Sequence, residues 1–185
     1  MDPTAAADSD IVSTPLSSAD VSELAYIELL YFAYRDFTAD ADRILERMGF
    51  GRAHHRVLYF VNRRPGMTVA ELLDILSITK QSLARVLRQL IESGHVAQRT
   101  GSTDRRQRLL YPTAKGRELI MELSQPQSRR IRAALTNSGT GQSDAVARFM
   151  EEMASPPAGR YNRARRVENL DGTDSVSDEY SRRTP

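Results

Sequence analysis

The chain has 185 residues, of which 40% are apolar and 27% charged, a composition typical of one soluble domain with extensions. It contains no cysteine, which excludes disulfides, thiolate zinc sites and a cysteine-based oxidant sensor. No apolar run approaches the roughly 18 residues of a membrane span, and residues 1–20 lack the basic start and apolar core of a signal peptide. We therefore expect a cytoplasmic protein.

Positive charge is concentrated in the middle of the chain. Residues 1–50 hold 3 Lys and Arg against 10 Asp and Glu, whereas residues 51–117 hold 13 against 4. The net charge of +2 thus hides a strongly basic segment. Such a segment is typical of a nucleic-acid-binding module, although a solvated basic face is an equally valid interpretation of charge alone.

Residues 1–20 are polar and small, which predicts a disordered N-terminal tail. Residues 22–50 then form a helical region that begins at Ser22, with apolar side chains at spacings of three and four and an unusually wide apolar stripe. The width favours a dimerisation helix over one buried within its own subunit. Asp40–Glu46 is expected to be a turn or a second short helix.

Residues 51–117 read as one DNA-binding lobe. Arg52–Asn62 is predicted to be a helix that ends at the Arg-Arg-Pro-Gly stretch 63–66. Thr68 and Glu71 have the spacing of a capping box, and the helix after them buries Val69, Leu72, Leu73 and Leu76. Thr79 is the predicted N-cap of the next helix.

The segment 79–93 has the two faces expected of a recognition helix that lies in a DNA major groove. Leu83, Val86 and Leu87 belong to an apolar stripe, while the opposite face has no acidic residue before Glu92. Arg pairs with guanine and Gln with adenine in the major groove, and a helix N-terminus attracts phosphate. The predicted DNA contacts from this segment are Thr79, Lys80, Gln81, Ser82, Arg85 and Arg88. The alternative is an ordinary amphipathic surface helix.

A cationic hairpin follows after Gly94, the predicted helix C-cap. Two strand-like runs, Val96–Thr100 and Gln107–Tyr111, flank a turn-rich tip, and Pro112 with Thr113 marks a strand end and a helix start. The whole hairpin, 96–111, is predicted to be a wing. Its predicted DNA-binding residues are Arg99, Asp104, Arg105, Arg106 and Arg108, although Asp104 has a second interpretation as a turn residue.

Residues 118–155 are predicted to contain the C-terminal helices. A helix over 114–136 is expected to turn Leu119, Ile120, Leu123, Ile131 and Leu135 inward and to bend or break at Pro126. A turn at Asn137–Gly141 precedes a last helix, Ser143–Met153, and residues 156–185 are predicted to be a disordered tail.

The order of elements and the stretch from Gly94 to Gly116 resemble the MarR family of bacterial transcription regulators. The family pattern Gly-Leu-Val/Ile-x-Arg, Asp-Arg-Arg and Leu-Thr-x-x-Gly is matched by Gly94, by Asp104-Arg105-Arg106 and by Thr113 with Gly116. The resemblance covers about Ser22 to Met153. Three residues depart from the pattern: His95, Gln98 and Pro112.

The resemblance implies that residues 118–155 are C-terminal dimerisation helices, which pack with the first helix, and it implies roles for the wing and a ligand site. Arg106 would enter the minor groove, held by a hydrogen bond to Asp104, while Arg105 and Arg99 would follow the phosphates. A small-molecule effector would bind where the dimerisation helices meet the DNA-binding lobe. The candidate lining residues are Tyr26, Tyr34, Phe37, His54 and Arg56, each of which has an alternative as plain core or surface.

No metal site, cofactor or catalytic motif is expected, since the three histidines are poorly placed for joint chelation and the sequence has no nucleophile elbow, phosphate-cradling loop or paired-carboxylate motif. The predicted fold is mainly α with a small β-hairpin wing: a winged helix-turn-helix with N- and C-terminal dimerisation helices. The predicted function is a homodimeric transcriptional regulator of pseudo-palindromic double-stranded DNA, with half-sites about 34–36 Å apart. Two alternatives are a winged-helix module for protein contacts and a nucleoid-associated protein without strong sequence preference.

Overall fold

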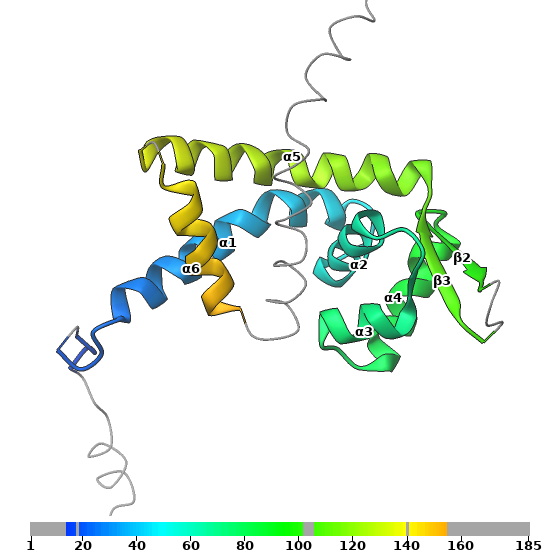
Figure 1. Ribbon diagram of the computed structural model, residues 1–185, viewed down its shortest axis with the longest axis horizontal. Helices are drawn as coiled ribbons and strands as arrows, with labels where there is room; N and C mark the ends of the chain where they lie inside the picture. The colour runs from blue at the N-terminus through cyan, green and yellow to red at the C-terminus, as the bar shows by residue number, and fades with distance from the viewer. Residues whose placement is uncertain (1–13, 18, 102–105, 140, 155–185) are drawn as a thin grey trace, which may run out of the picture. The chain divides into compact units, whose positions relative to one another are not determined.

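The computed structural model describes residues 14–17, 19–101, 106–139 and 141–154 (Figure 1). The chain separates after Asp40 into two compact units, which we describe one at a time. Its elements in chain order are α1 (Leu24–Glu46), α2 (Arg52–Arg63), β1 (Met67–Thr68), α3 (Val69–Leu76), α4 (Lys80–Glu92), β2 (Val96–Thr100), β3 (Arg108–Pro112), α5 (Ala114–Asn137) and α6 (Ser143–Met153).

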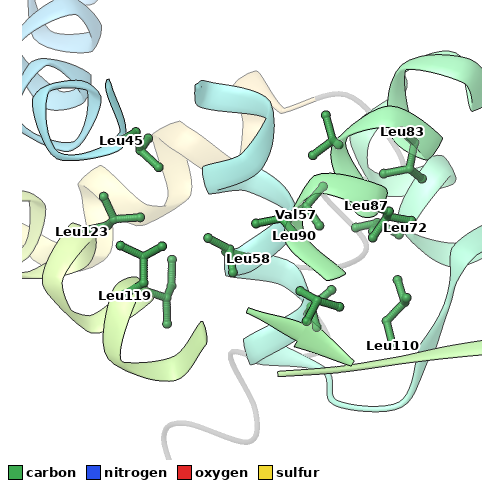
Figure 2. Packing of buried hydrophobic residues seen from close by; sticks show 14 of the residues in the cluster. Leu45, Val57, Leu58, Leu72, Leu83, Leu87, Leu90, Leu110, Leu119 and Leu123 are labelled. Atoms are coloured by element: carbon green, nitrogen blue, oxygen red, sulfur yellow. The ribbon is translucent and has the colours of Figure 1, made fainter. Parts of the chain in front are cut away.

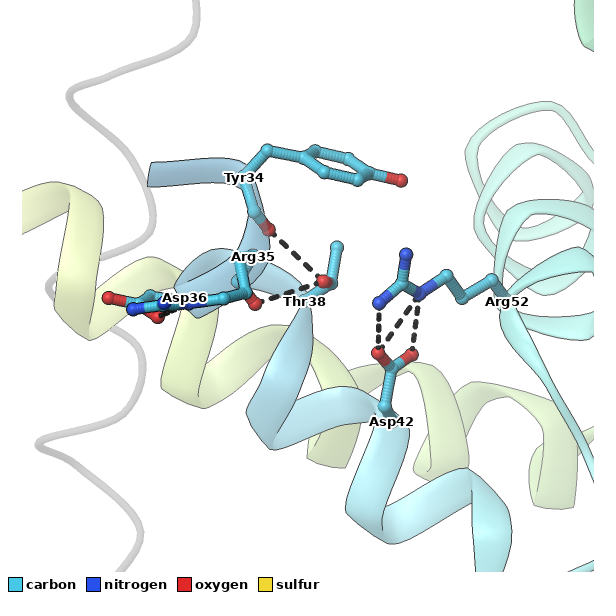
Figure 3. A network of polar contacts seen from close by, with 6 residues as sticks. All are labelled: Tyr34, Arg35, Asp36, Thr38, Asp42 and Arg52. Carbon is cyan, nitrogen blue, oxygen red and sulfur yellow. Dashed lines mark hydrogen bonds and ion pairs between the residues drawn. The ribbon is translucent and has the colours of Figure 1, made fainter. Parts of the chain in front are cut away.

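The first unit contains the larger part of α1 and leaves its apolar side chains exposed. The wide stripe predicted from the sequence is present: Tyr26, Leu29 and Tyr31 are each more than 60% exposed. Within this helix the Thr38 hydroxyl lies 3.0 Å from the Tyr34 carbonyl oxygen and 3.1 Å from that of Arg35 (Figure 3). The described residues therefore contain an apolar surface on α1 that the unit itself does not bury.

The turn or second helix expected at Asp40–Glu46 is wrong, because α1 continues unbroken to Glu46. Ala41 and Leu45 are four residues apart, so they share one helix face, and both are fully buried in the second unit. Asp42 accepts hydrogen bonds from the Arg52 guanidinium, the shortest at 2.7 Å (Figure 3). The burial of Ala41 and Leu45 and this ion pair tie the end of α1 to the rest of the second unit.

The second unit has one hydrophobic core built around α2. Val57, Leu58 and Val61 are fully buried, and α2 contacts α3, α4, α5 and β3. Leu72 of α3, Leu90 of α4 and Leu123 of α5 belong to the same core (Figure 2). The prediction of a buried apolar stripe on the 79–93 helix is confirmed, since Leu83, Val86, Leu87 and Leu90 all belong to this core.

Three helices begin with the same capping device, a threonine hydroxyl that accepts an otherwise unpaired backbone N–H. Thr68 accepts from Glu71, Thr79 from Ser82 and Thr113 from Gly116. The capping box predicted at Thr68 and Glu71 is confirmed, with the Glu71 carboxylate 2.7 Å from the Thr68 nitrogen. The Thr68 backbone N–H is the main cause that lowers the pKa of Glu71, and Arg64, 2.9 Å away, adds to it.

The sheet has three antiparallel strands in the order β1-β3-β2. The predicted hairpin is confirmed: Val96 pairs with Pro112 and Thr100 with Arg108. β3 begins and ends one residue later than expected, at Arg108 and Pro112. β1 was not predicted from the sequence, because two residues are too short to show the alternation that identifies a strand.

The C-terminal helices lie at their predicted positions, but not every side chain is buried as predicted. α5 runs through Pro126 without a break, since a proline removes one backbone donor while the other hydrogen bonds of the helix continue. The prediction that Ile131 points inward is wrong for a single chain, because it is 49% exposed. α6 occupies its predicted range but buries none of its residues.

Candidate nucleic-acid interface

The recognition helix α4 has one buried face and one exposed, cationic face. All six residues predicted to contact DNA from this segment are exposed: Thr79, Lys80, Gln81, Ser82, Arg85 and Arg88. Arg85 and Arg88 are three residues apart and therefore lie on the same side of the helix, opposite Leu83 and Leu90. This face can offer hydrogen-bond donors to guanine and to phosphate.

The N-terminal end of α4 is closed by Thr79. Its hydroxyl accepts from the Ser82 backbone at 3.2 Å and lies 2.9 Å from the Ser82 hydroxyl. The turn from α3 contains Ser77 in a left-handed conformation with φ 50°, which reverses the chain within three residues. The two helices are thus joined tightly, as a helix-turn-helix requires.

The wing arranges its arginines along β2 and β3. The Arg99 guanidinium lies over the Tyr111 ring, 5.4 Å from its centroid, and Arg108 donates to the Thr100 hydroxyl at 2.8 Å. The hairpin is closed by a hydrogen bond from the Gly101 N–H to the Gln107 carbonyl oxygen. Arg99, Arg106 and Arg108 are exposed. The predicted contacts Asp104 and Arg105 lie outside the described residues.

A set of contacts, which we call the α4–α5 seam, joins the end of α4 to the start of α5. The Thr113 hydroxyl donates to the Gly94 carbonyl oxygen at 2.7 Å, and the Lys115 ammonium donates to that of Ser93 at 2.9 Å. Gly116 packs so closely that a Cβ there would lie 2.0 Å from the His95 carbonyl oxygen. The recognition helix, the wing and α5 therefore meet at one closely packed, hydrogen-bonded junction.

Sequence reasoning treated Thr113 as a cap and Gly116 as a family motif, but it did not predict this seam. Only the cap could be predicted from local spacing, because the acceptors at 93–95 lie about twenty residues earlier in the chain. The sequence neighbours of Gly116 are typical of a helix and do not indicate that a glycine is required. Its requirement for glycine arises from a backbone that folding brings against it.

Two buried histidines contact the ring of Phe50. The Phe50 ring stacks on His54, with centroids 4.7 Å apart, and meets His95 edge-on at 5.4 Å. The Ser93 hydroxyl donates to the Gln89 carbonyl oxygen, so the His95 Nδ1, 2.9 Å from that hydroxyl, is the donor in their contact. His95 Nε2 has no hydrogen-bond partner among the described residues. Burial lowers the pKa of His95, and the Lys115 charge lowers it further.

The residues predicted to line an effector site differ in exposure. In the first unit Tyr26 and Tyr34 are 68% and 46% exposed, and Phe37 is half-buried. In the second unit Arg56 is exposed, while His54 is buried with both ring nitrogens hydrogen-bonded, to Gly51 and to Gln89. His54 is therefore part of the core. An open groove of about 490 Å³ runs along α5, and none of the five candidates lines it.

Among the described residues no three His, Asp or Glu side chains are grouped so that they could hold a metal ion. No helix in the described part of the chain is long and apolar enough to cross a membrane.

A tight helix-turn-helix, an antiparallel hairpin directly after it and a cationic exposed helix face together define a winged helix-turn-helix protein. Comparison with known proteins agrees with this class. Residues 48–107 match a model of the MarR family. The chain is 48% identical over 135 residues to the HTH-type transcriptional regulator PetP of Rhodobacter capsulatus, an alignment covering 73% of this chain and 81% of PetP.

Solved structures show the same fold. A crystal structure of MarR is 23% identical, with a TM-score of 0.54, and the alignment covers 86% of this chain and 99% of that one. A complex of S. aureus MepR with DNA is 15% identical, with a TM-score of 0.56 and coverage of 69% and 95%. A mutant E. coli MarR complexed with operator DNA is 20% identical, with a TM-score of 0.56 and coverage of 77% and 100%. The chain belongs to the MarR family.

Proposed function

We propose that this protein is a DNA-binding transcriptional regulator that acts as a homodimer on a pseudo-palindromic duplex. The observation that carries the proposal is the exposed face of α4, where Lys80, Arg85 and Arg88 lie with no acidic residue before Glu92. A generic solvent-exposed helix face mixes the two signs of charge, whereas this face matches the phosphates and base edges of a major groove.

The wing supports a second contact in the same proposal. Arg99, Arg106 and Arg108 are exposed on or beside the hairpin, and arginine is attracted to the negative potential of a narrow minor groove. In this proposal α4 reads base pairs, and the wing reads the shape of the flanking duplex. Asp104 and Arg105 belong to the same tip and are proposed to orient Arg106 and to contact phosphate, respectively.

The proposed dimer rests on apolar surfaces that a single chain leaves open. Ile27 and Leu30 on α1 are 58% and 43% exposed, and Phe149 and Met150 on α6 are 54% and 56% exposed. Exposed apolar patches of this kind mark interaction sites in water-soluble proteins. We propose that the α1 and α6 surfaces meet their counterparts in a second copy, as in an obligate dimer.

A small-molecule effector is a further part of the proposal, as is a cytoplasmic location. Binding of the effector near the dimer helices would change the separation of the two DNA-binding lobes. Tyr26, Tyr34, Phe37 and Arg56 remain the proposed contacts, while the satisfied hydrogen bonds of His54 favour a structural role. No catalytic role is proposed for any residue.

The test is selection of bound duplexes from a random pool by the purified full-length chain, followed by affinity measurements over a salt series. A regulator should select a two-fold symmetric sequence and bind it about 10³-fold or more tighter than random DNA, with affinity falling steeply as salt rises. Equal affinity for all duplexes would refute sequence-specific regulation and favour a nucleoid-associated protein. No DNA binding at all would favour a module for protein contacts.

Two arginine variants test the division of roles. Arg85→Ala should cost about 1–3 kcal/mol on the selected site and relax preference at particular base pairs. Arg106→Ala should weaken binding in a way that depends on the flanking sequence. Arg132→Ala, on the exposed surface of the later part of α5, is the matched control for a change of one positive charge. Identical losses on every sequence for Arg85 and Arg106 would contradict the division.

A further inference from the structure

The contacts around Phe50 connect the start of α2 to the end of the recognition helix. His54 is 8% exposed and His95 is 2% exposed, and the Phe50 ring contacts both. His54 belongs to the first turn of α2. His95 lies just after the end of α4, where its backbone N–H donates to the Leu90 carbonyl oxygen at 2.8 Å. One aromatic ring thus bridges two elements that are far apart in the sequence.

The hydrogen bonds of His54 require one tautomer. The Gly51 backbone N–H lies 3.0 Å from Nδ1, and because an amide N–H is only a donor, Nδ1 carries no proton. The ring proton is therefore on Nε2, which donates to the Gln89 carboxamide oxygen at 2.8 Å. On one side His54 caps the free amide at the start of α2, and on the other it holds a side chain of α4.

This bond restrains Gln89 in the last turn of α4. Since Oε1 accepts from His54, the carboxamide has a defined orientation, with its NH₂ group turned away from the imidazole. Gln89 is adjacent to Arg88 and one helical turn after Arg85, the residues of the proposed reading face. Recognition of base edges by such side chains requires placement to a fraction of an ångström, which depends on supporting hydrogen bonds.

We propose that His54 is a positioning residue for DNA recognition: through its Nε2–H bond to Gln89 it fixes the last turn of α4 against α2. The inference rests on the proposed DNA-binding function and extends it to a buried residue on another helix. The bond joins residues 35 positions apart, so it restrains α4 from outside the helix-turn-helix itself. Discrimination between DNA sequences should therefore depend on the His54–Gln89 pair, although neither residue is an arginine of the proposed reading face.

The experiment measures the ratio of affinities for the selected and a scrambled duplex, together with urea unfolding of the same samples. Gln89→Met removes the acceptor at nearly constant size, and Gln125→Met on α5 is the matched control, since it is exposed and has no such bond. Gln89→Met should lower the affinity ratio about 5- to 10-fold, the size expected from one hydrogen bond. Gln125→Met should leave the ratio unchanged.

A double-mutant cycle separates positioning from direct contact. His54→Phe keeps an aromatic ring against Phe50 but has no nitrogen, and it should lower the ratio about as much as Gln89→Met does. The double variant should be no worse than His54→Phe alone, because Gln89→Met removes only the bond that His54→Phe has already removed. Additive losses would mean that Gln89 acts on DNA independently of His54, which would overturn the proposal. A ratio for Gln89→Met equal to that of Gln125→Met would do the same.

A spectroscopic measurement covers the case in which His54→Phe does not fold. Long-range ¹H–¹⁵N spectra of the wild-type full chain should show a pyridine-type Nδ1 and a pyrrole-type Nε2 for His54, and Gln89→Met should shift the Nε2 signal. The opposite tautomer would overturn the proposal. Failure of the wild type to select any sequence would instead refute the proposed function, and this outcome is distinguishable because the nitrogen spectrum reports the bond without DNA.

Discussion

Gly116→Ala is the substitution whose effect can be worked out most directly from the structure. The added Cβ would lie 2.0 Å from the His95 carbonyl oxygen and 3.0 Å from its carbon. Non-bonded contacts of this kind do not occur below about 3 Å. The first turn of α5 must therefore move away from residue 95 by about 1 Å, and both atoms in the clash are backbone, so no side-chain rotation relieves it.

The displacement acts on the hydrogen bonds of the α4–α5 seam. The bonds from the Thr113 hydroxyl, the Thr113 N–H and the Lys115 ammonium are 2.7, 3.2 and 2.9 Å long. Lengthening each by about 1 Å removes them, at about 1 kcal/mol apiece. Alanine recovers up to about 1 kcal/mol through its better helix propensity. We expect the free energy of unfolding to fall by about 2–4 kcal/mol, with overpacking included.

The assay is urea unfolding followed by circular dichroism, with Gly51→Ala as the matched control. Gly51 has φ of −137° and open space at its Cβ position, so the same chemical change should cost less than about 1 kcal/mol there. The Gly51 N–H that reaches His54 is retained in the control. A Gly116→Ala protein as stable as the Gly51→Ala protein would refute the reasoning, because it would mean that the seam yields without loss.

Three further predictions concern the cap, the buried histidine and the dimer. Thr68→Ala should lower the free energy of unfolding by about 1 kcal/mol in urea unfolding, whereas Thr68→Ser should retain it, and a Thr68→Ala protein as stable as the wild type would contradict the cap. The pKa of Glu71 should stay below its ordinary value in both variants, as a carboxylate NMR titration can measure, because the backbone N–H of residue 68, the main cause of the lowering, is retained. Burial lowers the pKa of His95 in the folded chain, so the unfolded chain binds this proton first as the pH falls, at about pH 6.5. His95 should therefore leave the free energy of unfolding unchanged above that pH and lower it as the pH falls further. His95→Leu should therefore flatten the loss of stability between about pH 6.5 and 5 in urea unfolding, and a slope equal to that of the wild type would contradict it. Ile27→Glu and Phe149→Glu should each convert the proposed dimer to a monomer in sedimentation experiments, while Arg132→Ala should not; a dimer that persists in both would refute the proposed interface.

The parts of the fold that the sequence predicted depend on signals only a few residues long. Thr68, Thr79 and Thr113 each cap a helix through a bond to the third residue onward, so the bond and its sequence signature coincide. The two faces of α4 follow from a 3.6-residue period, and the wing follows from alternation between turn signals. The exposure of the α4 candidates could be predicted for the same reason.

Tertiary structure decided whatever depends on residues distant in the chain. α1 continues through Asp40–Glu46 because Ala41 and Leu45 enter a core formed by later helices, and the two-residue strand β1 exists because β3 lies beside it. Gly116 is required by a carbonyl group at residue 95, and His54 is bonded to Gln89, 35 residues away. Caps and periodicity are properties of a few consecutive residues. The close contacts of a backbone or a buried imidazole are properties of the folded chain, since the partners become neighbours only when the core forms.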